Sequence, residues 1–306
     1  MDSFPLLRNA AAGAGGADDD LRAALDGAGV RADFRQVPAP ELADEARRLS
    51  RAGAPLIAVS GGDGTVSAVA GALAGSDTRL VVFPGGTLNH FAAALGIRTH
   101  ADTLRGLAAN RFQAVDVGEV NGRVFVNGAS IGLYPRQLRI RSVWQPRIGK
   151  WPAAAVAGIA TLAGFPRRRV TLEGEGMKEE QVTALVWIGP GRGSFRDPVA
   201  APRELGSGVL EVVMIGARSR LRLLQLGMRA ALHGRDALRI AEEAEDCQVH
   251  TGPWFTLGRS RPHRVDIGVD GELVQLMSPL EFRLLPGALQ VCVAPPLPEG
   301  EEAAED

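Results

Sequence analysis

Residues 55–75, PLIAVSGGDGTVSAVAGALAG, decide the fold of this chain. A short apolar strand runs into the turn Gly61-Gly62-Asp63-Gly64-Thr65, and a helical pattern follows at once. Glycines let backbone N–H groups approach a phosphate closely, and a helix N-terminus adds positive potential. Asp63 suits a Mg²⁺ ion or a nucleotide hydroxyl, but an ordinary turn with Asp63 as a helix cap explains the five residues equally well.

Residues 79–96, RLVVFPGGTLNHFAAALG, repeat the same arrangement of strand, glycine-rich turn and helix. The second turn, Pro84 to Asn89, follows the next strand along the chain. The carboxyl ends of parallel strands meet at one edge of a sheet, where ligands of α/β folds bind. The two turns together therefore favour a nucleotide site, although neither has the G-x-G-x-x-G spacing of dinucleotide-binding proteins.

Strand and helix patterns alternate over residues 1–118, which predicts a Rossmann-like α/β nucleotide-binding domain with a mostly parallel sheet. Residues 119–286 contain short strands and the turn signals Asn121-Gly122 and Asp270-Gly271, typical of a β-sandwich domain. One helical pattern, residues 220–234, interrupts them. The strand at 287–295 is a candidate member of the first domain, to which the chain would return after the second.

The composition is that of a globular protein with 306 residues, 45% of them hydrophobic, and a net charge of −1. The small net charge argues against a general nucleic-acid binder. Two cysteines and no signal-peptide pattern favour the cytoplasm. The last ten residues, 297–306, hold five acids and no base, which predicts a solvated, disordered tail.

Lysine occurs only twice, at Lys150 and Lys178, beside 32 arginines. Neither lysine lies in the G-x-x-x-x-G-K-[ST] pattern of a phosphate-binding loop. Any phosphate chemistry in this chain must therefore use other groups.

GGDGTVSAVAGAL and VVFPGGTLNHFAAALGI together resemble the diacylglycerol kinase catalytic domain, more specifically bacterial soluble lipid kinases of the diacylglycerol and sphingosine kinase superfamily, which is related to NAD kinases. VDVGEV, VFVNGASIGLYPR, VDGEL and SPLEFRLLPGAL extend the resemblance to about residues 4–295. It implies two domains with the active site between them. It also implies transfer of the γ-phosphoryl group of ATP, with Mg²⁺, to a lipid hydroxyl, with diacylglycerol giving phosphatidic acid as the leading expectation.

The resemblance assigns ATP binding to the first turn and to two residues of the second: Gly61, Gly62, Asp63, Gly64, Thr65, Thr87 and Asn89. Asn9 matches the start of an Asn-Pro-x-x-G phosphate contact, but the proline is missing here. The resemblance makes Glu272 the catalytic base, with Asp270 supporting it, and places Asp63 and Asp116 near the metal. From the residues alone, Asp270 is a turn residue and Asp116 a strand-end residue.

Two departures from the family pattern keep other functions open. His90 follows Asn89 where the family often has Asp, and we expect it to start a helix and face solvent. Residues 205–210 read LGSGVL where the family often has Leu-Asp-Asp-Gly-x-Leu and a structural Mg²⁺. The alternatives are an NAD kinase-like enzyme with a soluble substrate, and a nucleotide- or lipid-binding protein that has lost catalysis.

The segment from Arg136 to Arg169 contains eight basic residues and no acid, with Trp144, Trp151 and Phe165 among them. Its apolar, helical centre is too short to span a bilayer, and its Ala and Gly content suits packing inside the protein. We expect the arginines and tryptophans to contact an anionic membrane surface. The expected partners are therefore ATP and a membrane lipid; a homodimer is left open.

Overall fold

The computed structural model describes residues 3–10, 17–164, 168–193, 205–216, 247–258 and 262–295. The chain divides into two compact units. The first contains Met1–Val115, Pro198–Pro202 and Gly287–Asp306, and the second contains Asp116–Asp197 and Arg203–Pro286. The expected helix at 220–234 and the acidic tail at 297–306 lie outside the described residues.

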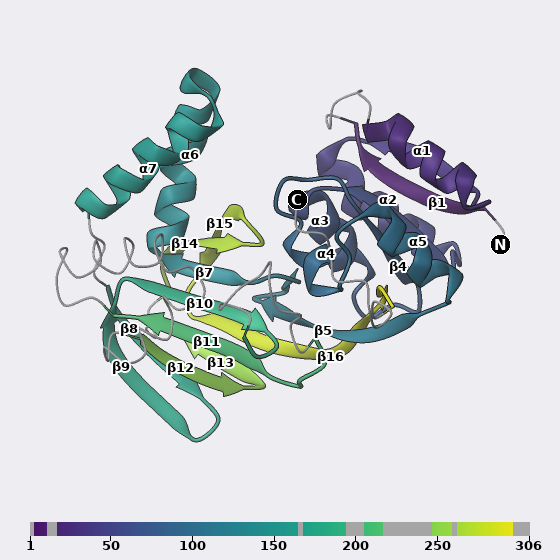
Figure 1. The fold of residues 1–306 in the computed structure, drawn as a ribbon. Coiled ribbons are helices and arrows are strands. Elements are labelled where there is room, and N and C mark those ends of the chain that lie inside the picture. The colour runs from purple at the N-terminus through teal and green to yellow at the C-terminus, as the bar shows by residue number, and fades with distance from the viewer. Residues whose placement is uncertain are drawn as a thin grey trace, which may run out of the picture. The chain divides into compact units, whose positions relative to one another are not determined.

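The first unit is an α/β domain with a parallel sheet (Figure 1), as the alternating pattern predicted. Its strands are β1 (Phe4–Asn9), β2 (Ala32–Val37), β3 (Leu56–Gly61), β4 (Arg79–Pro84) and the end of β16 (Leu280–Cys292). Its helices are α1 (Ala17–Gly27), η1 (Ala39–Glu41), α2 (Leu42–Arg51), α3 (Asp63–Leu73), α4 (His90–Ala94) and α5 (His100–Ala108).

The strand order β2-β1-β3-β4-β16 determines where this unit can bind a ligand. The chain first moves outward from β1 to β2, then crosses back to β3 on the other side of β1. Such a reversal opens a crevice at the carboxyl ends of the central strands, where α/β proteins bind ligands. Both glycine-rich turns leave the sheet at this edge, after β3 and β4.

The second unit is a β-sandwich. One sheet has the order β12-β11-β10-β7-β14-β15. In the other, β16, β13, β8 and β9 are neighbours in this order, β5 pairs with β16, and β6 pairs with β5. The strands are β5 (Phe112–Val120), β6 (Arg123–Phe125), β7 (Ala129–Gly132), β8 (Arg168–Gly174), β9 (Met177–Thr183), β10 (Leu185–Pro190), β11 (Leu210–Ile215), β12 (Cys247–Gly252), β13 (Trp254–Leu257), β14 (Arg264–Val269) and β15 (Glu272–Met277). Strands β5 and β16 each cross the division between the units.

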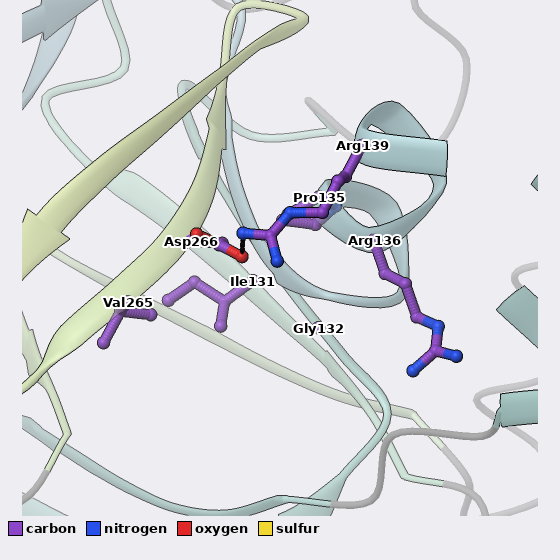
Figure 2. A pocket seen from close by; sticks show the side chains of 7 residues that line it. All are labelled: Ile131, Gly132, Pro135, Arg136, Arg139, Val265 and Asp266. Carbon is purple, nitrogen blue, oxygen red and sulfur yellow. Dashed lines mark hydrogen bonds and ion pairs between the residues drawn. The ribbon is translucent and has the colours of Figure 1, made fainter. Parts of the chain in front are cut away.

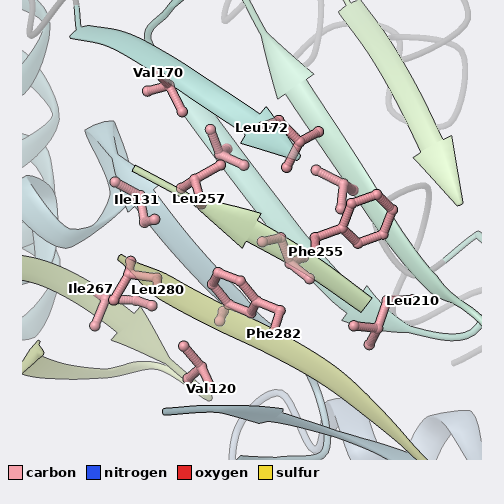
Figure 3. Close-up of a cluster of buried hydrophobic side chains, with 14 of the residues drawn as sticks. Val120, Ile131, Val170, Leu172, Leu210, Phe255, Leu257, Ile267, Leu280 and Phe282 are labelled. Atoms are coloured by element: carbon pink, nitrogen blue, oxygen red, sulfur yellow. The ribbon is translucent and has the colours of Figure 1, made fainter. Parts of the chain in front are cut away.

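The core of the sandwich is built by side chains from both of its sheets (Figure 3). Ile131 and Ile267 come from one sheet and Phe255 and Phe282 from the other, and all four are buried. Burying each such side chain contributes about 1.5–3 kcal/mol to folding. The alternating apolar residues of these short strands therefore account for the predicted sandwich.

Two hairpins of the second unit confirm their turn signals. Val120 pairs with Arg123 across Asn121-Gly122, and Val269 pairs with Glu272 across Asp270-Gly271. All four turn residues have positive φ, between 46° and 85°. Asn, Asp and Gly are the residues that adopt this conformation most readily, which is why the sequence could identify both turns.

The described residues of the second unit also form two helices, α6 (Leu133–Ile148) and α7 (Lys150–Gly164). Figure 1 shows them side by side, and α6 also contacts β7, β14 and β15. Ala153, Ala157 and Thr161 are buried at a spacing of four residues along α7, so small side chains let the two helices approach closely. Among the described residues, no helix has the length and apolar character needed to cross a membrane.

Candidate active site

The two glycine-rich turns of the first unit contact one another through their backbones. The N–H of Gly85 donates to the carbonyl of Gly61 at 3.0 Å. A Cβ built on Gly86 would lie 2.5 Å from the Cα of Gly62, and one on Gly85 would lie 3.2 Å from the Cα of Gly61. Glycine is thus required at these positions because two backbones meet there, and the turns form one surface at the sheet edge.

Asp63 is the first residue of α3, and its carboxylate links two helices. Its Oδ1 accepts a hydrogen bond from the backbone N–H of Phe91, in the first turn of α4, at 3.4 Å. The described part of the chain gives no hydrogen bond to Oδ2. One oxygen therefore holds the two helix starts together, and the other can bind a cation or a hydroxyl group.

Asn89 closes the second turn. It has positive φ, its Oδ1 accepts from the N–H of Gly86 at 2.8 Å, and its Nδ2 donates to the carbonyl of Gly86 at 2.9 Å. Thr87 and Leu88 lie at the exposed top of this turn, while Gly64 and Thr65 follow in the first turn of α3. Asn89 shapes the surface of the second turn and uses both ends of its amide to do so.

His90 begins α4, but the expectation that it faces solvent is wrong. It is half-buried, and within the described residues its buried Nδ1 has no hydrogen-bond partner. The burial of a single ring atom depends on the surrounding fold, which a sequence pattern cannot reveal. This position lies directly beside Asn89, at the base of the second turn.

Asn9 ends β1 at the same edge of the sheet. Arg8 pairs with Ser60 in the parallel register of β1 and β3, so Asn9 lies beside Gly61. Gly13, the other residue of the expected phosphate contact, lies outside the described residues. The structure therefore brings Asn9 to the glycine turns.

Arg8 is a candidate functional residue that the sequence did not suggest. This buried residue precedes Asn9, and burial and then the nearby charge of Arg22 lower the pKa of its guanidinium. Arginine stays charged in proteins, so Arg8 adds positive potential near the end of β1. The only sequence signal was a charged residue in an otherwise apolar strand.

Asp270 and Glu272 share one turn of the second unit, but their carboxylates have different surroundings. Asp270 Oδ1 accepts from the N–H groups of Asn127 and Gly128 at 2.8 and 2.9 Å, and its Oδ2 accepts from that of Val126 at 2.9 Å. The carboxylate therefore fixes the β14–β15 turn to the segment between β6 and β7. Its bonding is that of a structural residue.

Glu272 is the first residue of β15 and is exposed. Its Oε2 forms an ion pair with the guanidinium of Arg123 at 2.7 Å. The hydroxyl of Tyr134 lies 4.0 Å from a Cβ built on Gly271, so it is beside the same turn. Glu272 thus has the accessibility that a proton acceptor needs, with Arg123 to orient it.

Asp116 is buried near the start of the second unit. Its Oδ2 accepts from the N–H of Gly208 at 2.8 Å, and its own N–H donates to the carbonyl of Leu205 at 2.6 Å. It therefore anchors the turn that contains the altered LGSGVL motif. These bonds fit the structural interpretation of Asp116 better than the metal-binding one.

The described residues contain no group of three or more His, Cys, Asp or Glu side chains that could hold a metal ion. A Mg²⁺ ion in a kinase needs no such group, because one or two carboxylates and the substrate phosphates hold it. Asp63, with its second oxygen available, fits this requirement.

Residues 4–120 match the family model of the diacylglycerol kinase catalytic domain. A probable lipid kinase YegS-like of Pseudomonas fluorescens is 28% identical over 281 residues, covering 90% of each chain. A probable lipid kinase YegS of Salmonella gallinarum is 29% identical over 283 residues, covering 87% of this chain and 86% of that protein. A putative diacylglycerol kinase from Bacillus anthracis has a TM-score of 0.70 at 20% identity, covering 96% of this chain and 97% of its own, which supports the fold.

The family-model match and the lipid kinase relatives support a phosphotransferase that uses an alcohol group as acceptor. Over residues 4–120 the chain is similar to the diacylglycerol kinase catalytic domain, and over most of its length it is similar to the two probable lipid kinases.

Proposed function

We propose that this protein is an ATP- and Mg²⁺-dependent lipid kinase that converts diacylglycerol to phosphatidic acid. The observation that carries the proposal is the junction of the two glycine turns, which presents peptide backbone and Asp63 at one sheet edge. The family model and the relatives, which include probable lipid kinases, support a lipid acceptor over the soluble substrate of an NAD kinase.

The triphosphate of ATP binds at the joined turns in this proposal. Gly61, Gly62 and Gly64 leave room for the phosphates, and the N-terminus of α3 favours their negative charge. Asp63 would hold Mg²⁺, which when bound neutralises charge on the phosphate oxygens. The other ATP-binding residues in this proposal are Thr65 of the first turn, Thr87 and Asn89 of the second turn, and Asn9 at the end of β1.

Glu272 performs the proton transfer. The acceptor hydroxyl forms a bond to the γ-phosphorus, its proton goes to the Glu272 carboxylate, and the bond from the γ-phosphorus to the ADP oxygen breaks. Arg123 orients the carboxylate through their ion pair, and Asp270 holds the turn that carries it.

The lipid acceptor lies in a membrane, so the protein must reach a membrane surface. We assign peripheral contact with an anionic leaflet, on the cytoplasmic side, to the basic segment Arg136 to Arg169. Phe165 of that segment lies outside the described residues, and the side chain of Trp151 is not described.

Radiolabelled ATP, incubated with the protein and a total lipid extract, tests this function. We expect a labelled lipid that co-migrates with phosphatidic acid, and stronger labelling when diacylglycerol is added. A radiolabel in a different lipid would show that this lipid, and not diacylglycerol, is the acceptor. Label in NAD alone, or ATP consumption without a labelled product, would contradict the proposal.

A further inference from the structure

The end of the α6–α7 helical hairpin is exposed and apolar. We call residues 142–149 the hairpin tip; all eight are exposed. Three of them are large hydrophobic residues, Val143, Trp144 and Ile148, with exposed fractions of 52%, 42% and 39%. Exposed apolar residues that gather at one place mark an interaction surface more often than scattered ones do.

The charges of the hairpin are divided between its two ends. Near the strands, Arg139 of α6 forms an ion pair with Asp266 of β14, which also accepts from Gln275 at 2.9 Å. Figure 2 shows this pair at the wall of a small pocket, with Arg136 beside it. The charge of Arg139 is therefore largely neutralised within the protein.

The arginines near the tip lack such acidic partners in the described part of the chain. Arg141 bonds to Gln145 at 3.0 Å, and Arg147 bonds to the carbonyl of Val143 at 3.1 Å, both within α6. No aspartate or glutamate occurs anywhere between Leu133 and Gly164. The tip thus combines apolar side chains with uncompensated positive charge.

Folding does not account for the tip. The hairpin is held together by the buried stripe of Ala153, Ala157 and Thr161 and is joined to the sandwich through α6. Figure 1 shows that the turn joining the two helices lies at the end of the hairpin away from the strands. The exposed side chains at that end are therefore available to an external partner.

We propose that the hairpin tip inserts into an anionic lipid leaflet, with the strand-proximal end of the hairpin outside it. Trp144 would lie at the interface between headgroups and acyl chains, which tryptophan prefers. Arg141 and Arg147 would contact headgroup phosphates while their alkyl chains remain in the apolar region. A lipid surface fits both properties of the tip, and this inference rests on the proposed lipid-kinase function.

Vesicle co-sedimentation of the full chain tests the proposal. Vesicles of phosphatidylcholine alone are compared with vesicles that also contain phosphatidylglycerol. We expect binding to the anionic vesicles, reduced about tenfold or more in Val143→Ser/Trp144→Ala, which removes apolar surface. Arg147→Gln should reduce binding about fivefold, and only on anionic vesicles.

Two controls make the test specific. Trp254 of β13 is exposed to 39%, nearly as much as Trp144, and Trp254→Ala should leave binding unchanged. Ile159, in the middle of α7, is 71% exposed, and Ile159→Ser should also leave binding unchanged if the tip enters first. If Ile159→Ser reduced vesicle binding as much as Val143→Ser/Trp144→Ala does, insertion of the tip first would be overturned.

A soluble substrate separates this inference from the proposed function. The tip variant should phosphorylate monomeric short-chain diacylglycerol at the unmodified rate and lose turnover only on vesicles. If the unmodified chain phosphorylates neither form, the proposed function fails while co-sedimentation still tests the tip. The inference is overturned if tip variants bind vesicles normally, or if they change the oligomeric state and not vesicle binding.

Discussion

The joined glycine turns of the first unit and the Asp270-Gly271-Glu272 turn of the second unit use carboxylates in different ways. In the glycine turns, a single residue, Asp63, holds α4 with one oxygen, and its other oxygen accepts no hydrogen bond within the described residues. In the Asp270-Gly271-Glu272 turn, structural bonding and accessibility belong to two different residues. Asp270 accepts three peptide N–H groups, and Glu272 lies exposed beside Arg123. A carboxylate's role therefore follows from what its oxygens already bind.

The largest stability effect should come from Asp270→Ala. Three backbone N–H groups would lose their acceptor, so we expect the free energy of unfolding to fall by about 3 kcal/mol or more. Glu272→Ala removes only an exposed ion pair and should change it by less than about 1 kcal/mol. Urea unfolding of both variants measures the difference, and similar losses would abolish the distinction between the two residues.

Gly86→Ala should have the next largest effect. The new Cβ would lie 2.5 Å from the Cα of Gly62, and separating the turns should cost about 1–3 kcal/mol and weaken ATP binding. Gly27→Ala is the matched control, because no atom lies within 4 Å of its Cβ position. Thermal unfolding and ATP titration check both variants; equal behaviour would show that the turns need no close contact.

Asp63→Asn should separate the two uses of that side chain. Asparagine keeps an oxygen for the N–H of Phe91 but removes the negative charge available to Mg²⁺. We expect ATP affinity to fall about tenfold with Mg²⁺ and little without it, with nearly unchanged stability. Calorimetric titration in both conditions checks this. A loss that is independent of Mg²⁺ would remove the metal role from Asp63.

The smallest effect concerns Glu45 of α2, which belongs to neither turn. Hydrogen bonds from Arg48 and then Arg35 lower the pKa of its carboxyl. A lowered pKa in the folded state stabilises the protein above the ordinary value of 4.5, and this is lost as the pH falls through the lowered pKa. Arg48→Ala should thus be slightly less stable at neutral pH and match the parent in acid. A constant difference would contradict this cause.

The sequence predicted the parts of the structure that depend on local patterns. Asn121-Gly122 and Asp270-Gly271 marked two hairpins because few residues adopt positive φ, and the glycine turns marked the edge of the parallel sheet. The α6 helix was not predicted, because its arginines interrupt any apolar face and its support comes from packing on β7, β14, β15 and α7.

The sequence could not reveal how the site residues are held. Asp270 binds a segment more than 140 positions away, Arg123 pairs with Glu272 across 149 positions, and Asp116 reaches Gly208 across 92. Such pairings arise only when distant strands are brought together. The buried Arg8 and the half-buried His90 likewise depend on neighbours that no local pattern specifies.

The central claim is that Glu272 accepts the proton of the lipid hydroxyl. The most direct measurement compares phosphoryl transfer to diacylglycerol by Glu272→Gln and Glu281→Gln. Both glutamates are 57% exposed and paired with an arginine, so the two variants differ mainly in position. We predict that Glu272→Gln loses turnover by about 100-fold or more with ATP binding retained, while Glu281→Gln keeps it. Near-normal turnover in Glu272→Gln would contradict the claim.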